Sequence, residues 1–392
     1  MKVAIVHEWL TARAGSELCF ERLANLWPDA DLYALARKPG VPMNVGGRPI
    51  RTTFLDRVAR APAGRAATLP LMPLAYRSLR PQADYDLVIS SSHAFSRAFP
   101  TEGAVHVSYT YTPIRYVWYP ETDARGAHPL LTPARAVLRR ADRHYARDVD
   151  AFAGISTVVA ERINEAYGRE ADVIFPICDT DFFHPADRDL ADDQPPMPDV
   201  QPTVDRLPDG GYLLSVGRFI PYKRHDIAIE LAARLGLSAV VAGRGPDLPR
   251  LREVDQRCGG RTVFLDAPSR EEIRGLYRRA LFTVFPPIED FGIVPVESLA
   301  CGTPVLAVDA GGARDTVPAT VGARSPSQEL PDLLDSATKL LANLPDPGTC
   351  RDWAEHFSPT MFDKRIVDWV DRAMIAAAAG PHARLGERKP LL

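Results

Sequence analysis

Short apolar runs that alternate with helical sequence constrain the fold of this chain most. In the first half the runs cover 3–7, 86–90, 104–108 and 151–155. In the second half they cover 212–216, 239–242, 262–265, 282–285 and 304–307. Intervening stretches such as 17–27 carry apolar residues at helical spacing. Strands that alternate with helices predict parallel α/β sheets with right-handed crossovers.

A stretch dense in Pro, Asp and Gly, from Pro185 to Gly211, separates the two halves. Because 392 residues exceed one ordinary hydrophobic core, we expect two Rossmann-like, doubly wound domains at 1–205 and 206–358. The amphipathic stretch 362–378 predicts a terminal helix within 359–392, and we expect this helix to pack back on the N-terminal domain. The residues from Gly380 onward form a tail.

Composition narrows the class of protein. Apolar residues make up 46% of the chain and charged residues 25%, as in soluble globular proteins. A net charge of -3 offers no general attraction to nucleic acid, which is therefore not an expected partner. The chain has neither a signal-peptide pattern nor a run of 18 apolar residues. Five scattered cysteines favour reduced thiols over disulfides or a zinc site, so we expect a cytoplasmic protein.

The residues that follow each strand matter most, because ligands of open parallel sheets bind beyond the carboxyl ends of the strands. Gly217 follows the run 212–216, and the cations Arg218 and Lys223 come next, five residues apart. Two fixed positive charges suit a diphosphate leaving group, although isolated loop charges are commonly just solvated.

Gly243, Gly245 and Pro246 form a turn after the next run, 239–242. Such turns accommodate nucleotides but are weak evidence alone.

The segment 289–304 is the most informative. Glu289 lies on a loop, and Glu297 lies inside the helix that follows. Gly292 and Ile293 at the helix entrance would present backbone N–H groups to phosphate. We expect Glu297 to accept hydrogen bonds from ribose and Glu289 from the transferred sugar. The alternative, two solvent-facing glutamates beside a buried turn, leaves the Phe-Gly-Ile and Ala-Cys-Gly-Thr-Pro segments unexplained.

Four motifs resemble, in order, those of the large retaining GT-B glycosyltransferase family that includes bacterial mannosyltransferases and glycogen synthases. They are VGRFIPYKRHDIAIE, VVAGRGPDLPRL, PPIEDFGIVPVESLACGTPVLA and GGARDTV, within 212–317. The N-terminal half resembles the WbaZ-like mannosyltransferase branch through VHEWLTARAGSE, YDLVISSSHAFSRAF and YTYTPIRYVWYPE. The resemblance implies a GT-B fold, with two Rossmann-like domains facing each other across a cleft.

The resemblance also assigns roles. Arg218 and Lys223 would neutralise the donor diphosphate, Glu289 would contact the donor sugar, and Glu297 would hold the ribose. The remaining donor-binding positions that we expect are Gly15, Gly217, Gly243, Gly245, Pro246, Phe291, Gly292, Ile293 and Val294. No cofactor beyond the nucleotide-sugar substrate and no catalytic metal are expected. We interpret Asp179-Thr180-Asp181, which matches a metal-binding pattern of another glycosyltransferase fold, as a chance occurrence.

The sequence departs from the family pattern at two places. Ala14-Gly15 stands where a Gly-Gly pair is common, and Tyr111-Thr112-Pro113 stands where the family often has His-Thr-Pro. A tyrosine cannot replace an imidazole as an acid or base near neutral pH. His93, after a strand, is a further catalytic candidate that lines the cleft; the alternative is a structural histidine.

The segment Arg57 to Pro81 mixes arginines with apolar residues. This composition suits an interfacial segment that reaches a lipid-linked acceptor at the inner face of the membrane. The alternative is a core-facing helix with ordinary surface arginines.

The leading hypothesis is a hexosyltransferase of polysaccharide biosynthesis that transfers mannose from GDP-mannose to a glycan or lipid-linked acceptor. One alternative is a sugar-nucleotide epimerase of related fold. The other is a non-catalytic partner that binds sugar nucleotides, and Tyr111 keeps that hypothesis open.

Overall fold

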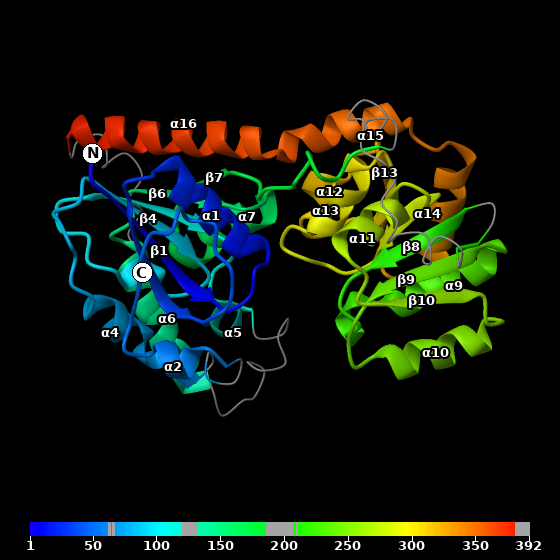
Figure 1. Cartoon of the computed structure of the whole chain (residues 1–392), viewed down its shortest axis with the longest axis horizontal. Helices are drawn as coiled ribbons and strands as arrows, with labels where there is room; N and C mark the ends of the chain where they lie inside the picture. The colour runs from blue at the N-terminus through cyan, green and yellow to red at the C-terminus, as the bar shows by residue number, and fades with distance from the viewer. Residues whose placement is uncertain (62–63, 65–66, 120–131, 186–206, 209–210, 381–392) are drawn as a thin grey trace. The chain divides into compact units, whose positions relative to one another are not determined.

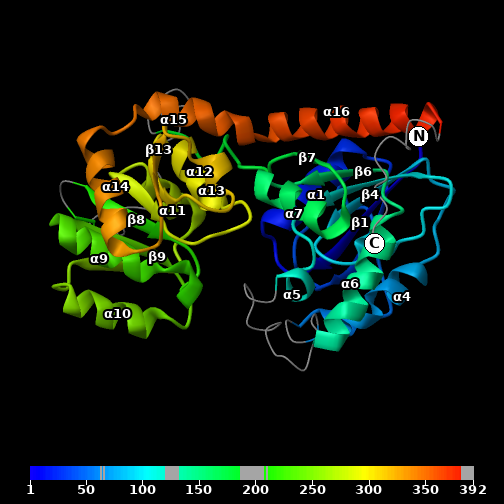
Figure 2. The ribbon, with the colours of Figure 1, turned by 180° about the vertical axis from the view of Figure 1, so that it is seen from behind.

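The computed structural model describes residues 1–61, 64, 67–119, 132–185, 207–208 and 211–380. The chain forms two compact units (Figure 1 and, from behind, Figure 2). Unit 1 comprises Met1–Ile177 and Phe362–Leu392, and unit 2 comprises Cys178–Met361. Each unit is built around a parallel sheet with helices on its faces, so the expected pair of Rossmann-like α/β domains is confirmed.

The sheet of unit 1 has seven parallel strands in an order that reverses direction once. From one edge to the other these are β3 (Ile50–Thr52), β2 (Asp31–Arg37), β1 (Val3–Leu10), β4 (Leu87–Ser92), β5 (Val105–Thr110), β6 (Ala151–Gly154) and β7 (Ala171–Val173). The strand order switches direction between β1 and β4. Loops after these two strands therefore diverge and leave room for a ligand.

Helices cover both faces of this sheet. Side chains of β1, β2 and β4 share one core cluster with α2 (Asp56–Ala59), η1 (Leu69–Leu71), α4 (Met72–Arg77), η2 (Ser96–Ala98), α5 (Arg115–Trp118) and α6 (Thr132–Ala146). In Figures 1 and 2, α1 (Gly15–Leu26), α7 (Thr157–Tyr167) and most of α16 (Pro359–Ala378) lie on the side away from α4 and α6. Within unit 1, Asp363 of α16 forms an ion pair with Arg22, and Trp369 is buried.

Unit 2 repeats the architecture with six parallel strands. Their order is β10 (Thr262–Asp266), β9 (Ser238–Gly243), β8 (Tyr212–Val216), β11 (Phe282–Phe285), β12 (Val305–Val308) and β13 (Gly322–Ser325). The helical elements are η7 (Pro221–Lys223), α9 (His225–Leu235), α10 (Leu248–Arg257), α11 (Arg270–Tyr277), α12 (Ile293–Ala300), α13 (Ala313–Thr316), α14 (Leu330–Ala342), α15 (Pro347–Ala354) and η8 (Glu355–Phe357). Here the direction of the order switches between β8 and β11.

The units divide earlier in the chain than the boundary that we expected after residue 205. The amide of Cys178 donates to the carbonyl of Phe357 at 2.8 Å. The Arg351 guanidinium donates to the carbonyls of Thr180 and Phe183 at 2.8 and 2.7 Å. These bonds attach 178–183 to unit 2. The Pro-rich stretch lies mostly in 186–206, outside the described residues.

All five cysteines are free thiols, and all but Cys258 are buried. None of the helices in the described part of the chain is long and apolar enough to cross a membrane.

Candidate active site

The loops that follow β8 and β11 meet at the switch point of unit 2. Lys223, at the end of η7, forms an ion pair between its Nζ and Oε1 of Glu289, 66 residues further along the chain. The side chains are only 12% and 22% exposed, respectively. A shielded ion pair is more rigid than a surface pair, because less water competes for either partner. The fold thus brings together two of the predicted catalytic residues.

His225, the first residue of α9, fixes the loop that carries Arg218 and Lys223. Its Nε2 lies 3.1 Å from the carbonyl oxygen of Arg218, and its Nδ1 lies 2.8 Å from Oγ of Ser215. Burial lowers the pKa of His225 to about 4. A neutral ring must then donate from Nε2 to the carbonyl and accept at Nδ1 from the serine. The sequence does not predict this role of His225, because a single histidine after a basic turn does not indicate which backbone groups it will contact.

The glycines of the β8 and β9 loops allow the two loops to touch. A Cβ atom on Gly243 would lie 1.8 Å from the carbonyl oxygen of Gly217, and one on Gly245 would lie 2.3 Å from that of Phe219. The amide of Gly217 donates to the carbonyl of Ala242 at 3.0 Å. Glycine is therefore needed here for backbone contact within the protein. Pro246 ends the same turn, just before α10.

The entrance of α12 follows Glu289 directly. Gly292 is its N-cap residue, with φ of 81°, and no side chain caps the helix. Ile293 and Val294 form the first turn, and Phe291 is buried beside Phe357 at a ring distance of 5.7 Å. Uncapped amides at this position suit an anion.

A second glycine pair supports this segment. The amide of Gly312 donates to the carbonyl of Glu289 at 2.8 Å. A Cβ atom on Gly312 would lie 2.4 Å from Cα of Phe291. We noted Gly311-Gly312 in the sequence only as part of a motif. Two adjacent glycines three residues after the end of β12 are the sequence signal for such close backbone packing.

Glu297 lies in α12 next to a buried phenol. The hydroxyl of Tyr277 donates to Oε2 of Glu297 at 3.1 Å. Burial raises the pKa of Glu297 to about 7, and the hydrogen bond from Tyr277 and the positive charge of Arg270 oppose this shift. The carboxyl group therefore changes its charge near neutral pH. It accepts hydrogen bonds best at a pH above about 7, where it is ionised.

The candidates of unit 1 lie at the switch point of its sheet. Gly15 is the first residue of α1. The hydroxyl of Tyr111 donates to the carbonyl of Ser16 at 2.9 Å, and its oxygen lies 3.0 Å from Oγ of Ser91. The ring stacks on His93 with centroids 4.1 Å apart. Burial raises the pKa of Tyr111 well above its ordinary value. Tyr111 is thus a neutral phenol that links β4 to the start of α1.

His7 completes this cluster from β1. Its Nδ1 lies 3.0 Å from Oγ of Ser91 and 3.1 Å from the carbonyl of the same residue. Burial lowers the pKa of His7 to about 4, so the ring is neutral. The backbone amide of His93 donates to Oε2 of the buried Glu8 at 2.9 Å. The position of His93 is therefore fixed by its own strand end and by β1.

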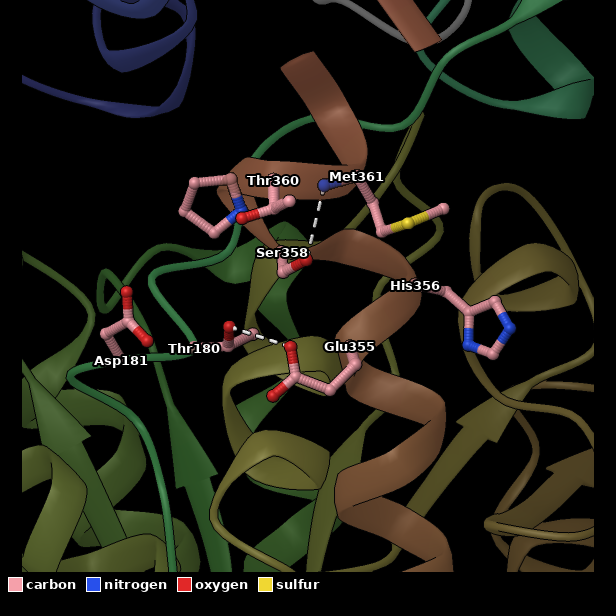
Figure 3. A pocket seen from close by; sticks show the side chains of 8 residues that line it. Thr180, Asp181, Glu355, His356, Ser358, Thr360 and Met361 are labelled. Carbon is pink, nitrogen blue, oxygen red and sulfur yellow. Dashed lines mark hydrogen bonds between the residues drawn. The ribbon is translucent and has the colours of Figure 1, made fainter. Parts of the chain in front are cut away.

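A cavity of about 390 Å³ lies elsewhere in unit 2 (Figure 3). Its lining is Thr180, Asp181, Glu355, His356, Ser358, Pro359, Thr360 and Met361. Thr180 donates to Glu355 at 3.2 Å, and the amide of Met361 donates to Oγ of Ser358 at 3.4 Å. None of the predicted donor-site residues lines this cavity.

Within the described part of the chain, no group of three or more His, Cys, Asp or Glu side chains is placed to hold a metal ion. In the Asp179-Thr180-Asp181 segment, Asp179 instead accepts a hydrogen bond from Arg270 at 2.9 Å.

Residues 203–355 match the family model for glycosyl transferases group 1. The chain is 34% identical to D-inositol 3-phosphate glycosyltransferase of Mycolicibacterium smegmatis over 196 residues, which are 47% of this chain and 43% of that protein. It is 33% identical to the enzyme of the same name from Mycobacterium bovis over 185 residues, which are 44% of this chain and 36% of that protein. The matches span less than half the length of these curated relatives.

Solved structures extend the similarity of fold to nearly the whole chain. HepE of Anabaena in complex with UDP superposes with a TM-score of 0.71 at 18% identity and covers 95% of this chain and 100% of its own. Sucrose-phosphate synthase from Thermosynechococcus elongatus gives 0.68 at 17% identity, with 96% and 100% covered. The two units thus have the fold of GT-B glycosyltransferases.

Proposed function

We propose that this protein is a metal-independent, retaining glycosyltransferase that uses a nucleotide-diphosphate sugar. The observation that carries the proposal is the shielded Lys223–Glu289 ion pair at the switch point of unit 2. It lies between a cationic loop and the uncapped entrance of α12. The match of residues 203–355 to the glycosyl transferases group 1 model supports the assignment.

The chemistry that we propose depends on charge and position. Arg218 and Lys223 stabilise the diphosphate as the bond between its oxygen and the anomeric carbon breaks. The acceptor hydroxyl oxygen bonds to the anomeric carbon on the same face, and its proton passes to the leaving phosphate. Glu289 orients Lys223 and accepts hydrogen bonds from the sugar, while Glu297 accepts them from the ribose. We assign acceptor binding to unit 1, and we propose Gly15 as a donor-binding residue and His93 as a catalytic residue.

At a finer level, we propose transfer of a hexose, namely mannose from GDP-mannose, to a glycan or lipid-linked acceptor in polysaccharide biosynthesis. The N-terminal resemblance to WbaZ-like mannosyltransferases supports this choice. Among the structural neighbours, HepE was solved with UDP and with UDP-glucose. The donor panel must therefore include uridine donors alongside GDP-mannose.

Incubation of the full chain with radiolabelled GDP-mannose, UDP-glucose, UDP-galactose and ADP-glucose tests the proposal. Transfer to an acceptor, or slow release of free sugar with its anomeric configuration retained, is the expected result. An altered sugar still attached to its nucleotide would instead identify an epimerase. Binding of a donor without either product would identify a non-catalytic partner.

A further inference from the structure

Large apolar side chains are exposed to solvent in one short part of unit 1. Phe54 is 60% exposed, Val58 55%, Leu71 49% and Leu74 61%. They lie in or beside α2, η1 and α4, within 21 residues of one another in sequence. Side chains of this size cost free energy in water, so a cluster of them calls for an explanation.

The fold itself turns these residues outward. Leu55 and Ala59 of the α2 region belong to the core cluster under β1, β2 and β4, together with Met72, Ala75 and Tyr76 of α4. The opposite faces of both helices therefore point away from the sheet. Along α4 and the residue before it, Leu71, Leu74 and Arg77 recur every three residues on that outer face, and all three are exposed.

The charge of the same region is strongly positive. Residues 50–81 contain six arginines and a single acid, Asp56, whereas the whole chain has a net charge of -3. Asp56 already forms an ion pair with Arg60. The exposed guanidinium groups of Arg57, Arg77 and Arg80 have no hydrogen bond or ion pair with any residue that the structure describes.

The neighbouring helix α6 extends this face. Its Leu138, Ala141 and Tyr145 pack against the same core cluster, and its outer side exposes Val137, at 69%, and Arg140. Figure 1 shows α2, α4 and α6 along one side of unit 1.

We propose that this surface, which we call the α2–α4 face and define by Phe54, Arg57, Val58, Leu71, Leu74 and Arg77, binds an anionic lipid bilayer. The apolar side chains enter the boundary between headgroups and acyl chains, and the arginines contact lipid phosphates. Charge complementarity favours this partner. The arginines, which have no partner among the described residues, match the anionic outer layer of a bilayer, and the apolar side chains beside them match the apolar layer beneath. Nucleic acid would use the arginines but gain little from four aliphatic or aromatic contacts.

This inference goes beyond the donor site of unit 2. Delivery of the enzyme to a lipid-borne acceptor is a consequence that rests on the proposed function, but bilayer binding does not.

Co-sedimentation of the full chain with vesicles tests the inference. We expect binding to phosphatidylcholine vesicles that contain phosphatidylglycerol, little binding to pure phosphatidylcholine, and weakening by salt. Two double variants, Leu71→Ser with Leu74→Ser and Arg57→Gln with Arg77→Gln, should each lower the partition coefficient about tenfold or more. Matched controls are Val367→Ser with Ile375→Ser, exposed apolar residues on α16, and Arg234→Gln with Arg252→Gln on unit 2.

Equal binding to both kinds of vesicle, no binding to either, or equal losses in the control variants would overturn the inference. Self-association in sedimentation velocity that the Leu71 and Leu74 variant abolishes, without vesicle binding, would instead identify a contact between copies of the chain. Nucleotide titration of the same samples separates this test from the donor site. Variants of the α2–α4 face should bind nucleoside diphosphate as the unmodified protein does.

Discussion

Lys223 and Glu289 form the contact on which the proposed chemistry depends. Lys223→Ala removes a positive charge at the position where negative charge develops, and Glu289→Ala removes the carboxylate that orients Lys223 and accepts hydrogen bonds from the sugar. We therefore expect turnover to fall about 100-fold or more in each variant. The melting temperature should change little, because both side chains keep some exposure to solvent. Initial rates with the radiolabelled donor and thermal scans check this prediction.

A matched control exists on the surface of α14. Lys339 and Asp335 form an ion pair whose side chains are 73% and 63% exposed. Lys339→Ala should leave turnover unchanged. Rates near those of the unmodified protein in both Lys223→Ala and Glu289→Ala would remove these residues from the site.

Glu297 gives a prediction about stability and pH. Its pKa rises from 4.5 to about 7 on folding, so the folded protein holds the proton more tightly than the unfolded chain. Ionisation of Glu297 therefore lowers the free energy of unfolding. This loss is absent below about pH 4.5 and reaches its full size, about 3 kcal/mol at most, above about pH 7. Glu297→Gln should therefore raise the free energy of unfolding at pH 8 relative to the unmodified protein. Urea titrations should show no such gain at pH 4.5; a gain of equal size at both pH values would contradict the burial argument.

Single residues also mark the limit of prediction from the sequence. The loops after β8 and β11 were recognisable from their glycines and charges. The pairing of Lys223 with Glu289 was not, because 66 residues separate them and only the strand order brings them together. From the sequence alone, Tyr111 indicates only that an imidazole is missing where the family often has histidine. The structure instead gives its hydroxyl a bond to the carbonyl of Ser16, which no local pattern reveals.

Among the structural elements of unit 1, a buried charge network joins η2, α5, α6 and α7. Asp142, fully buried, accepts hydrogen bonds from Arg97 at 2.5 Å, from the indole of Trp118 at 2.8 Å and from Tyr167 at 2.7 Å. Arg97 is 2% exposed. Loss of one partner leaves the other charge buried and uncompensated, which typically costs about 3–5 kcal/mol.

We therefore expect Asp142→Asn to destabilise unit 1 by about 3 kcal/mol or more. Asp335→Asn, in the exposed pair of α14, should cost well under about 1 kcal/mol. Chemical denaturation of both variants measures the difference. Similar midpoints would show that solvent or relaxation compensates the buried arginine.

With one exception, the predicted elements follow the strength of their patterns. The exception is β2, which we did not predict although its residues 32–36 are apolar and buried. The apolar runs predicted β1, β4, β5 and β6 in unit 1 and the first five strands of unit 2 within a few residues. The strands β3 and β7 have three residues each and lie at sheet edges, where few side chains are buried. The sequence of β13, Gly-Ala-Arg-Ser, has no apolar run. In these three strands, pairing with a neighbouring strand determines the extended conformation, and the local sequence pattern does not reveal that pairing.

For the whole molecule, the division into units has a direct consequence. Unit 2 is continuous in sequence from Cys178 to Met361 and contains its own six-stranded sheet and its own cores. We expect a fragment of residues 178–361 to fold and to bind nucleoside diphosphate with an affinity similar to that of the full chain. Circular dichroism and calorimetry of the fragment check this; an unfolded fragment would show that unit 2 needs unit 1 to fold.

The most direct test of the central claim is calorimetric titration of the full chain with GDP, UDP, ADP and dTDP, repeated with Lys223→Ala. We predict that one equivalent of at least one of these nucleotides binds, GDP first, and that the variant binds it with an affinity about tenfold or more lower. Absence of binding by all four, or equal affinity in the variant, would contradict a diphosphate site at the loops after β8 and β11.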